Sequence, residues 1–203
     1  MYKTIKTSTL PNFCKRINSI DEINNYFTAN LTNKYNRVRI IGDIHGCYTA
    51  LQQAITPWDE KTLYIFCGDY LERGIENKEM MYEMMRLSTL PNTIMLEGNH
   101  ERHIANFAFN TNLDRSKRFM KEVVAPIVKD MTKKEIVSLQ RELRLFYKSL
   151  RQCYPFSFHG KKYLVSHGGL SYVPNMTFIA TSTFINGFGA YETDIAKIYD
   201  NNY

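Results

Sequence analysis

The sequence has no apolar run close to the ~20 residues that a membrane-spanning helix needs. It has no positively charged start followed by an apolar stretch, so no secretory signal is visible. Its four cysteines are scattered and form no C-x-x-C pair, and Cys47 and Cys67 lie inside motif segments where a disulfide would be disruptive. These absences predict a reduced, cytoplasmic protein without a membrane partner.

The sequence also lacks internal repeats and low-complexity linkers, which favours one folded unit. With 203 residues, 44% of them hydrophobic and 13% aromatic, the chain is long and apolar enough to bury a core. We therefore expect a single domain over residues 1–203.

Positive charge is concentrated in one part of the chain. Residues 110–162 contain 13 Lys and Arg against 5 Asp and Glu, a local charge of +8, so the other residues together carry −2 of the total +6. A basic segment can attract a phosphate-rich or acidic substrate. The alternative interpretation is a solvated helix face without a ligand.

Strand-like and helix-like segments alternate along the chain. Four β-rich runs each end in a turn that contains glycine: Arg37–Ile41, Leu63–Cys67, Thr93–Leu96 and Tyr163–Val165. Helical patterns at Thr49–Ile55 and Glu76–Leu87 separate the first three runs, and a capping-box spacing predicts a further short helix at about 20–29. This order predicts an α/β fold with right-handed βαβ crossovers and a largely parallel sheet flanked by helices.

A helical insert is expected at about residues 103–152. Apolar residues recur there at steps of three or four, which fits two or three amphipathic helices, interrupted near Pro126. We expect this insert to cover one side of the functional site.

Polar residues follow each of the four predicted strands. The four turns read Gly42-Asp43-Ile44-His45-Gly46, Gly68-Asp69-Tyr70-Leu71-Glu72-Arg73-Gly74, Gly98-Asn99-His100-Glu101 and Ser166-His167-Gly168-Gly169. The carboxyl ends of strands in an open α/β sheet form the ligand crevice, so these side chains can converge.

The residue types in these turns suit a pair of divalent metals. Carboxylate, imidazole and amide oxygen are ligands for Mn²⁺, Fe²⁺ or Zn²⁺. Asp43 and His45 are two residues apart and can face one ion, and a carboxylate such as Asp69 can bridge two ions roughly 3.5–4 Å apart. A water between two such cations becomes hydroxide near neutral pH and can attack phosphorus.

The four motifs resemble those of the calcineurin-like metallophosphoesterases, in the branch of the serine/threonine phosphoprotein phosphatases. The resemblance covers about residues 37–190 and implies that family's β-sandwich flanked by helices. It implies two divalent metals, with Mn²⁺ preferred, and the following site residues. Asp43, His45 and Asp69 would hold the first metal, Asp69, Asn99 and His167 the second, while His100 would be the general acid, Glu72 its carboxylate partner and Arg73 the phosphate clamp.

Three features depart from the family pattern. Glu72 stands where the family usually has Asp, one methylene shorter. Glu97 stands where eukaryotic members have Arg, which is more typical of the bacterial and phage branch. No His follows His167, although the family has a late Gly-His motif that supplies a ligand of the second metal.

Three functions remain open from the sequence. The first is metal-dependent hydrolysis of phosphate monoesters in a phosphoprotein, nucleotide or polynucleotide. The second is a catalytically weak or regulatory phosphatase-like binding protein with an incomplete second metal site. The third is a nucleic-acid-binding module that uses the basic insert, for which salt-sensitive binding would be diagnostic.

Overall fold

The computed structural model describes residues 30–169 and 181–187. Its strands are β1 (Arg37–Ile41), β2 (Thr62–Phe66), β3 (Thr93–Met95), β4 (Cys153–Phe158) and β5 (Lys161–Ser166). Its helices are α2 (Tyr48–Ile55), α3 (Asn77–Leu87), α4 (Glu101–Phe109), η2 (Leu113–Ser116), α5 (Lys117–Phe119), η3 (Met120–Val124), α6 (Ala125–Val128), α7 (Lys133–Ser149) and α8 (Thr181–Asn186). The predicted helix at 20–29 lies outside the described residues.

The first three strands form a parallel sheet in the order β1-β2-β3, as the alternation of strands and helices predicted. Ile41, Phe66 and Met95 stand in register at the ends of these strands. The central strand β2 is buried along its whole length, as the continuous apolar run from Leu63 to Phe66 indicates. The loops that follow the three strands therefore begin at one edge of the sheet.

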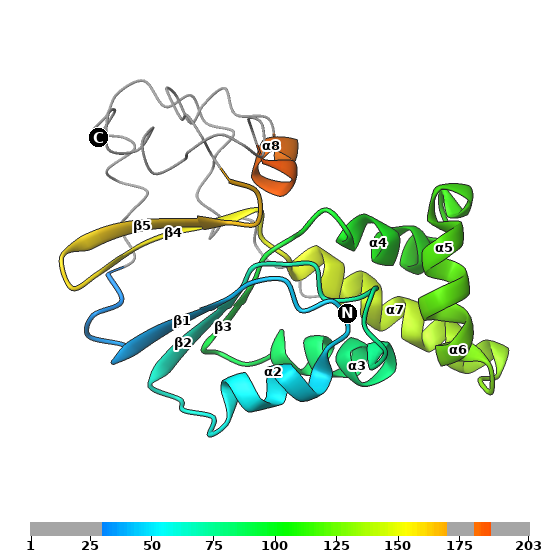
Figure 1. The fold of residues 1–203 in the computed structure, drawn as a ribbon, viewed down its shortest axis with the longest axis horizontal. Helices are drawn as coiled ribbons and strands as arrows, with labels where there is room; N and C mark the ends of the chain where they lie inside the picture. The colour runs from blue at the N-terminus through cyan, green and yellow to red at the C-terminus, as the bar shows by residue number, and fades with distance from the viewer. Residues whose placement is uncertain (1–29, 170–180, 188–203) are drawn as a thin grey trace, which may run out of the picture.

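The fourth predicted strand, β5, belongs to a separate hairpin and pairs antiparallel with β4. The sequence did not predict β4, where Pro155 interrupts an otherwise aromatic run. Figure 1 shows this hairpin on one face of the parallel sheet. A small core between the two layers joins Leu63 and Ile65 of β2 to Phe156 and Val165 of the hairpin. The two layers form the sandwich that the family resemblance implied.

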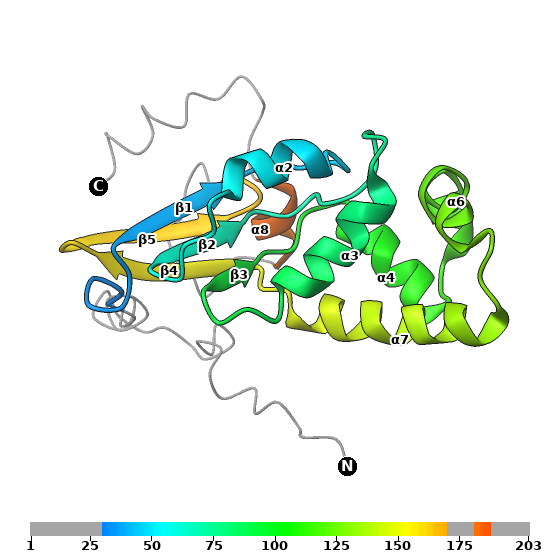
Figure 2. The ribbon, with the colours of Figure 1, turned by 90° about the horizontal axis from the view of Figure 1, so that it is seen from below.

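The other face of the parallel sheet carries helices α2 and α3 (Figures 1 and 2). Successive residues of a strand point to opposite faces, so Tyr64 and Phe66 of β2 face this side. They join a larger core that includes Leu51 of α2 and Met80 and Met84 of α3. Both helices begin within one residue of their predicted starts, because the 3.6-residue spacing of these apolar side chains is unambiguous.

Helices α4 to α7 form the expected helical insert, at the end of the sheet where β1 and β2 finish (Figures 1 and 2). Thr132 caps the N-terminus of helix α7, and its side chain and that of Glu135 form a capping box. An interruption was predicted near Pro126, and the irregularity found there is a π-helical segment and not a break in the helical chain. The chain stays helical there through the π-helical segment η3, and Pro126 is accommodated in the first turn of α6. Proline lacks the N–H that a continuing helix would use, and the wider turns of the π-helical segment lie directly before it.

Within residues 30–169 and 181–187, no helix is both long and apolar enough to cross a membrane.

Candidate active site

The loops after β1 and β2 are bonded to each other through their backbones. The N–H groups of His45 and Gly46 donate to the carbonyls of Asp69 and Tyr70, at 2.9 and 2.8 Å. The N–H of Gly74 donates back to the carbonyl of His45 at 2.8 Å. The first two motifs therefore form one folded surface.

Four residues of this surface have left-handed backbone conformations that side chains rarely adopt. The φ angles are 48° at His45, 52° at Asp69, 74° at Glu72 and 64° at Arg73. Each such residue costs on the order of 1–3 kcal/mol and persists only where neighbouring structure imposes it. Their concentration in two loops makes this region a candidate functional site.

Asp43, His45 and Asp69 offer a compact set of metal ligands. One donor atom from each residue lies within 4.8 Å of the others. His45 Nε2 lies 3.8 Å from a carboxylate oxygen of Asp43 and 3.6 Å from one of Asp69. Atoms that each lie about 2 Å from one ion are separated by roughly 3–4 Å, so these spacings fit a shared cation.

The imidazole of His45 supports this interpretation. Its Nδ1 lies 3.1 Å from the carbonyl of Leu71, so Nδ1 carries the proton and Nε2 presents a lone pair. Nε2 is buried and has no hydrogen-bond partner. A buried nitrogen without a partner is unfavourable, and a cation between the two carboxylates would satisfy it.

A second pair of candidate ligands, Asn99 and His167, lies beside Asp69. His167 Nδ1 lies 2.9 Å from the carbonyl of Cys67, which leaves Nε2 as an acceptor. That Nε2 lies 3.0 Å from Asn99 Oδ1 and 3.6 Å from an Asp69 oxygen. Three acceptors facing one another suit a bound cation, with Asp69 between the two ligand groups.

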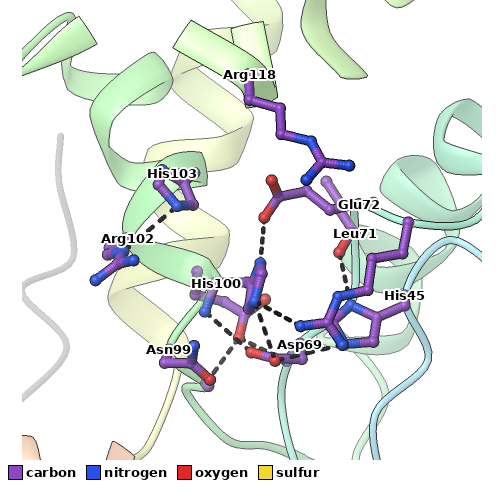
Figure 3. Close-up of polar contacts among 12 residues, drawn as sticks. His45, Asp69, Leu71, Glu72, Asn99, His100, Arg102, His103 and Arg118 are labelled. Atoms are coloured by element: carbon purple, nitrogen blue, oxygen red, sulfur yellow. Dashed lines mark hydrogen bonds and ion pairs between the residues drawn. The ribbon is translucent and has the colours of Figure 1, made fainter. Parts of the chain in front are cut away.

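His100 lies at the border of this cluster. Its Nδ1 is paired with the carboxylate of Glu72, and its Nε2 lies 3.8 Å from an Asp69 oxygen (Figure 3). Arg73 Nη2 lies 3.3 Å from the same Nε2. The longer side chain of Glu72 thus still reaches His100. The structure brings together all eight residues that the sequence nominated.

Glu101 was overlooked by the sequence reasoning, which assigned it no role. Its side chain is fully buried, and one carboxylate oxygen accepts from the N–H groups of Asp69 and Gly98 at 2.8 and 2.7 Å. The other oxygen accepts from Tyr70 N–H at 3.1 Å. Burial raises the pKa of Glu101 to about 8, while the N–H groups act in the opposite direction. This carboxyl group joins the second motif to the third.

The close contact between Gly98, Asp69 and Glu101 requires a glycine at position 98. A Cβ at Gly98 would lie 2.3 Å from a carboxylate oxygen of Asp69 and 2.7 Å from one of Glu101. No other residue type fits without displacing the candidate bridging ligand. The glycine of the third motif therefore has a steric cause.

A family model and several known proteins match this chain. A family model described as calcineurin-like phosphoesterase matches residues 36–196. The chain is 38% identical over 80 residues to serine/threonine-protein phosphatase 2 of Salmonella typhimurium, covering 38% of this chain and 34% of that protein. It is 29% identical over 92 residues to the serine/threonine-protein phosphatase PP2A-like PPG1 of Candida albicans, covering 42% of this chain and 22% of that protein.

A solved structure is also similar in outline. A protein serine/threonine phosphatase from Saccharomyces cerevisiae superposes with a TM-score of 0.47 at 19% identity, covering 84% of this chain and 50% of that one. For the two phosphatases compared by sequence, the chain spans about a third or less of each relative's own length. The family match covers most of the chain and includes all four motifs, and the chain belongs to the calcineurin-like phosphoesterase family.

Proposed function

We propose that this protein is a metal-dependent phosphomonoesterase. The observation that carries the proposal is the buried Nε2 of His45, which has no partner and faces the carboxylates of Asp43 and Asp69. Beside it lies a histidine paired with a carboxylate, an arrangement that suits general acid catalysis. Family membership supports the same reaction class.

The donor sets fit two divalent cations, with Mn²⁺ as the first choice and Fe²⁺ or Zn²⁺ as alternatives. Asp43, His45 and Asp69 would hold the first, and Asp69, Asn99 and His167 the second. When bound, such cations acidify water and neutralise charge on the phosphoryl group.

The remaining residues act on the substrate. Arg73 is exposed, and its planar guanidinium is suited to bind two phosphate oxygens. His100 would donate the proton on Nε2 to the leaving oxygen. Glu72 would hold the Nδ1 proton and so fix the orientation of the ring.

The proposed substrates are a phosphorylated protein or a nucleotide. We place the protein in the cytoplasm, because the three cysteines in the described part of the chain are free. Nucleic-acid binding by the basic insert remains a prediction.

Hydrolysis of p-nitrophenyl phosphate by the full chain tests the proposal. We expect activity that needs added Mn²⁺, disappears with a chelator and is lost in Asp69→Asn. The matched control is Asp114→Asn, because the Asp114 side chain is 95% exposed and pairs only with exposed Lys117 in the described residues. Equal activity with and without metal, or in Asp69→Asn and the control, would refute the proposal.

The alternative is a phosphatase-like binding protein with weak or no turnover. It is favoured by the second ligand group, which draws only Asp69, Asn99 and His167 from the described residues. The same assay separates the two functions. Stoichiometric Mn²⁺ binding without hydrolysis of the aryl phosphate would favour the binding protein.

A further inference from the structure

The side chain of Asn77 binds the backbone on both sides of Arg73. Asn77 is the first residue of α3 and is half-buried. Its Oδ1 accepts a hydrogen bond from the N–H of Glu72 at 2.8 Å, and its Nδ2 donates one to the carbonyl of Gly74 at 2.7 Å. One amide group thus holds the chain just before and just after Arg73. The sequence motifs did not nominate Asn77.

The segment that Asn77 binds has an unusual backbone. Glu72 and Arg73 have φ angles of 74° and 64°, in the left-handed region. Such residues persist only where the surrounding structure imposes their conformation. The N–H of Gly74 donates to the carbonyls of Glu72 and His45, at 2.7 and 2.8 Å, but the first of these bonds lies within the segment. The two bonds to Asn77 therefore supply much of what fixes the segment relative to the rest of the site.

Asn77 is itself held firmly by the core. It begins α3, whose Met80 and Met84 are completely buried beneath the parallel sheet. The preceding residue, Glu76, donates its N–H to the carbonyl of Gly46 at 3.0 Å. The amide of Asn77 therefore has a fixed position, and its hydrogen bonds extend that position to the backbone of Arg73.

Gly46 of the first motif leaves space for this amide. A Cβ at Gly46 would lie 2.5 Å from Asn77 Oδ1 and 2.9 Å from its Cγ. The amide therefore lies between the loop after β1 and the loop after β2, beside the residue that follows His45. A larger residue at position 46 would displace the group that holds Arg73.

The two hydrogen bonds require both an acceptor and a donor on one side chain. An asparagine amide offers both, so its oxygen faces the N–H of Glu72 and its nitrogen faces the carbonyl of Gly74. A serine in place of Asn77 could make at most one of these bonds, and an alanine could make neither.

We propose that Asn77 is a positioning residue for Arg73 and acts through it on the phosphate group of the substrate. The inference rests on the proposed function, which assigns Arg73 to the phosphate oxygens. Arg73 Nη2 lies 3.3 Å from His100 Nε2, so a shift of the backbone at Arg73 would move its guanidinium away from the proposed acid.

The test is a double-mutant cycle on the full chain supplied with Mn²⁺. Asn77→Ala should lower kcat/KM for p-nitrophenyl phosphate and weaken competitive inhibition by inorganic phosphate, each on the order of tenfold, and Asn77→Ser should lose less. In the Arg73→Ala background, Asn77→Ala should cost less than about threefold, because the group through which Asn77 acts is absent. Should Asn77→Ala fail to fold, Asn77→Ser takes its place in the cycle.

Asn92→Ala is the matched control for a purely structural asparagine. Asn92 is buried, and its Nδ2 donates to the carbonyls of Thr62 and Asp59, at 2.9 and 3.2 Å, at the end of β2 opposite the site. This variant should lower Tm and leave inhibition by inorganic phosphate unchanged.

Three results would overturn the role of Asn77 and leave the phosphatase standing. They are a full tenfold loss from Asn77→Ala in the Arg73→Ala background, unchanged phosphate inhibition in both Asn77 variants, and an equal weakening of that inhibition in Asn92→Ala. Failure of the wild type to hydrolyse the aryl phosphate would reject the proposed function. Calorimetric binding of inorganic phosphate to wild type and Asn77→Ser would then decide the role of Asn77, and equal affinities would overturn it.

Discussion

Replacing Glu101 by Gln tests whether this buried carboxylate holds together the two loops that begin at Gly68 and Gly98, which carry candidate metal ligands. The carboxylate accepts hydrogen bonds from three backbone N–H groups, those of Asp69 and Gly98 on one oxygen and that of Tyr70 on the other. A Gln amide can place its oxygen there and keep the bonds from Asp69 and Gly98. Its NH₂ group then faces the N–H of Tyr70, so that two donors meet without an acceptor.

A buried donor left without a partner costs about 1–3 kcal/mol. Burial disfavours the charged form of Glu101, as its raised pKa indicates, and Gln carries no charge. We therefore expect a destabilisation in the lower part of this range, about 1–2 kcal/mol. For a chain of this length, about 2–4 °C is lost per kcal/mol, which predicts a fall in Tm of about 2–8 °C.

Activity should fall as well, because the N–H of Asp69 is fixed by Glu101. A displacement of about 1 Å at a reacting centre can cost 10²-fold in rate, so a loss of tenfold or more in kcat/KM is expected. Thermal unfolding and aryl phosphate hydrolysis should be measured on the same samples, well below the lower Tm.

Glu97→Gln is the matched control, four residues earlier. Glu97 accepts a hydrogen bond from the Tyr147 hydroxyl at 2.6 Å, and a Gln oxygen can accept the same bond. Glu97→Gln should therefore lower Tm and kcat/KM less than Glu101→Gln does. Unchanged Tm and activity in Glu101→Gln would refute the reasoning. A lower Tm with unchanged kcat/KM would show that Glu101 stabilises the fold without positioning Asp69.

Three further predictions concern other groups. His45→Asn should lower the bound Mn²⁺, because Nε2 is the buried donor without a partner, and elemental analysis after gel filtration measures this. His100→Asn should keep the metal and lower kcat about 10²–10⁴-fold, less for good leaving groups; metal loss would contradict the acid role. The hydrogen bond from Arg86 lowers the pKa of Glu83 below 4.5, so its stabilising effect is present above that pH and lost as pH falls. Glu83→Gln should therefore flatten the fall in Tm between pH 5 and 3, whereas exposed Glu79→Gln should not.

The sequence predicted the parallel sheet and the candidate site because both depend on short-range patterns. An apolar run such as that of β2, followed by Gly68 and Asp69, indicates a strand end and a polar turn together. Parallel pairing then places such turns at one edge of the sheet. The nominated ligands could thus be grouped without knowledge of any long-range contact.

The features that the sequence missed depend on contacts that are distant in the chain. Strand β4 is stable because it pairs with β5 and packs on β2, and Pro155 made its local pattern weak. Glu101 looks like an ordinary acidic residue in the first turn of a helix, where carboxylates are common at the surface. Its burial follows from the backbone N–H groups of Asp69 and Tyr70, some thirty residues earlier in the chain.

The four left-handed residues of the candidate site also bear on how a ligand would bind. Folding itself confines His45, Asp69, Glu72 and Arg73 to unusual backbone angles through hydrogen bonds and close packing. The conformational entropy of these loops is therefore lost during folding, before any ligand arrives. Binding of an ion or a phosphate would need little further ordering of the backbone, so most of the interaction free energy would appear as affinity.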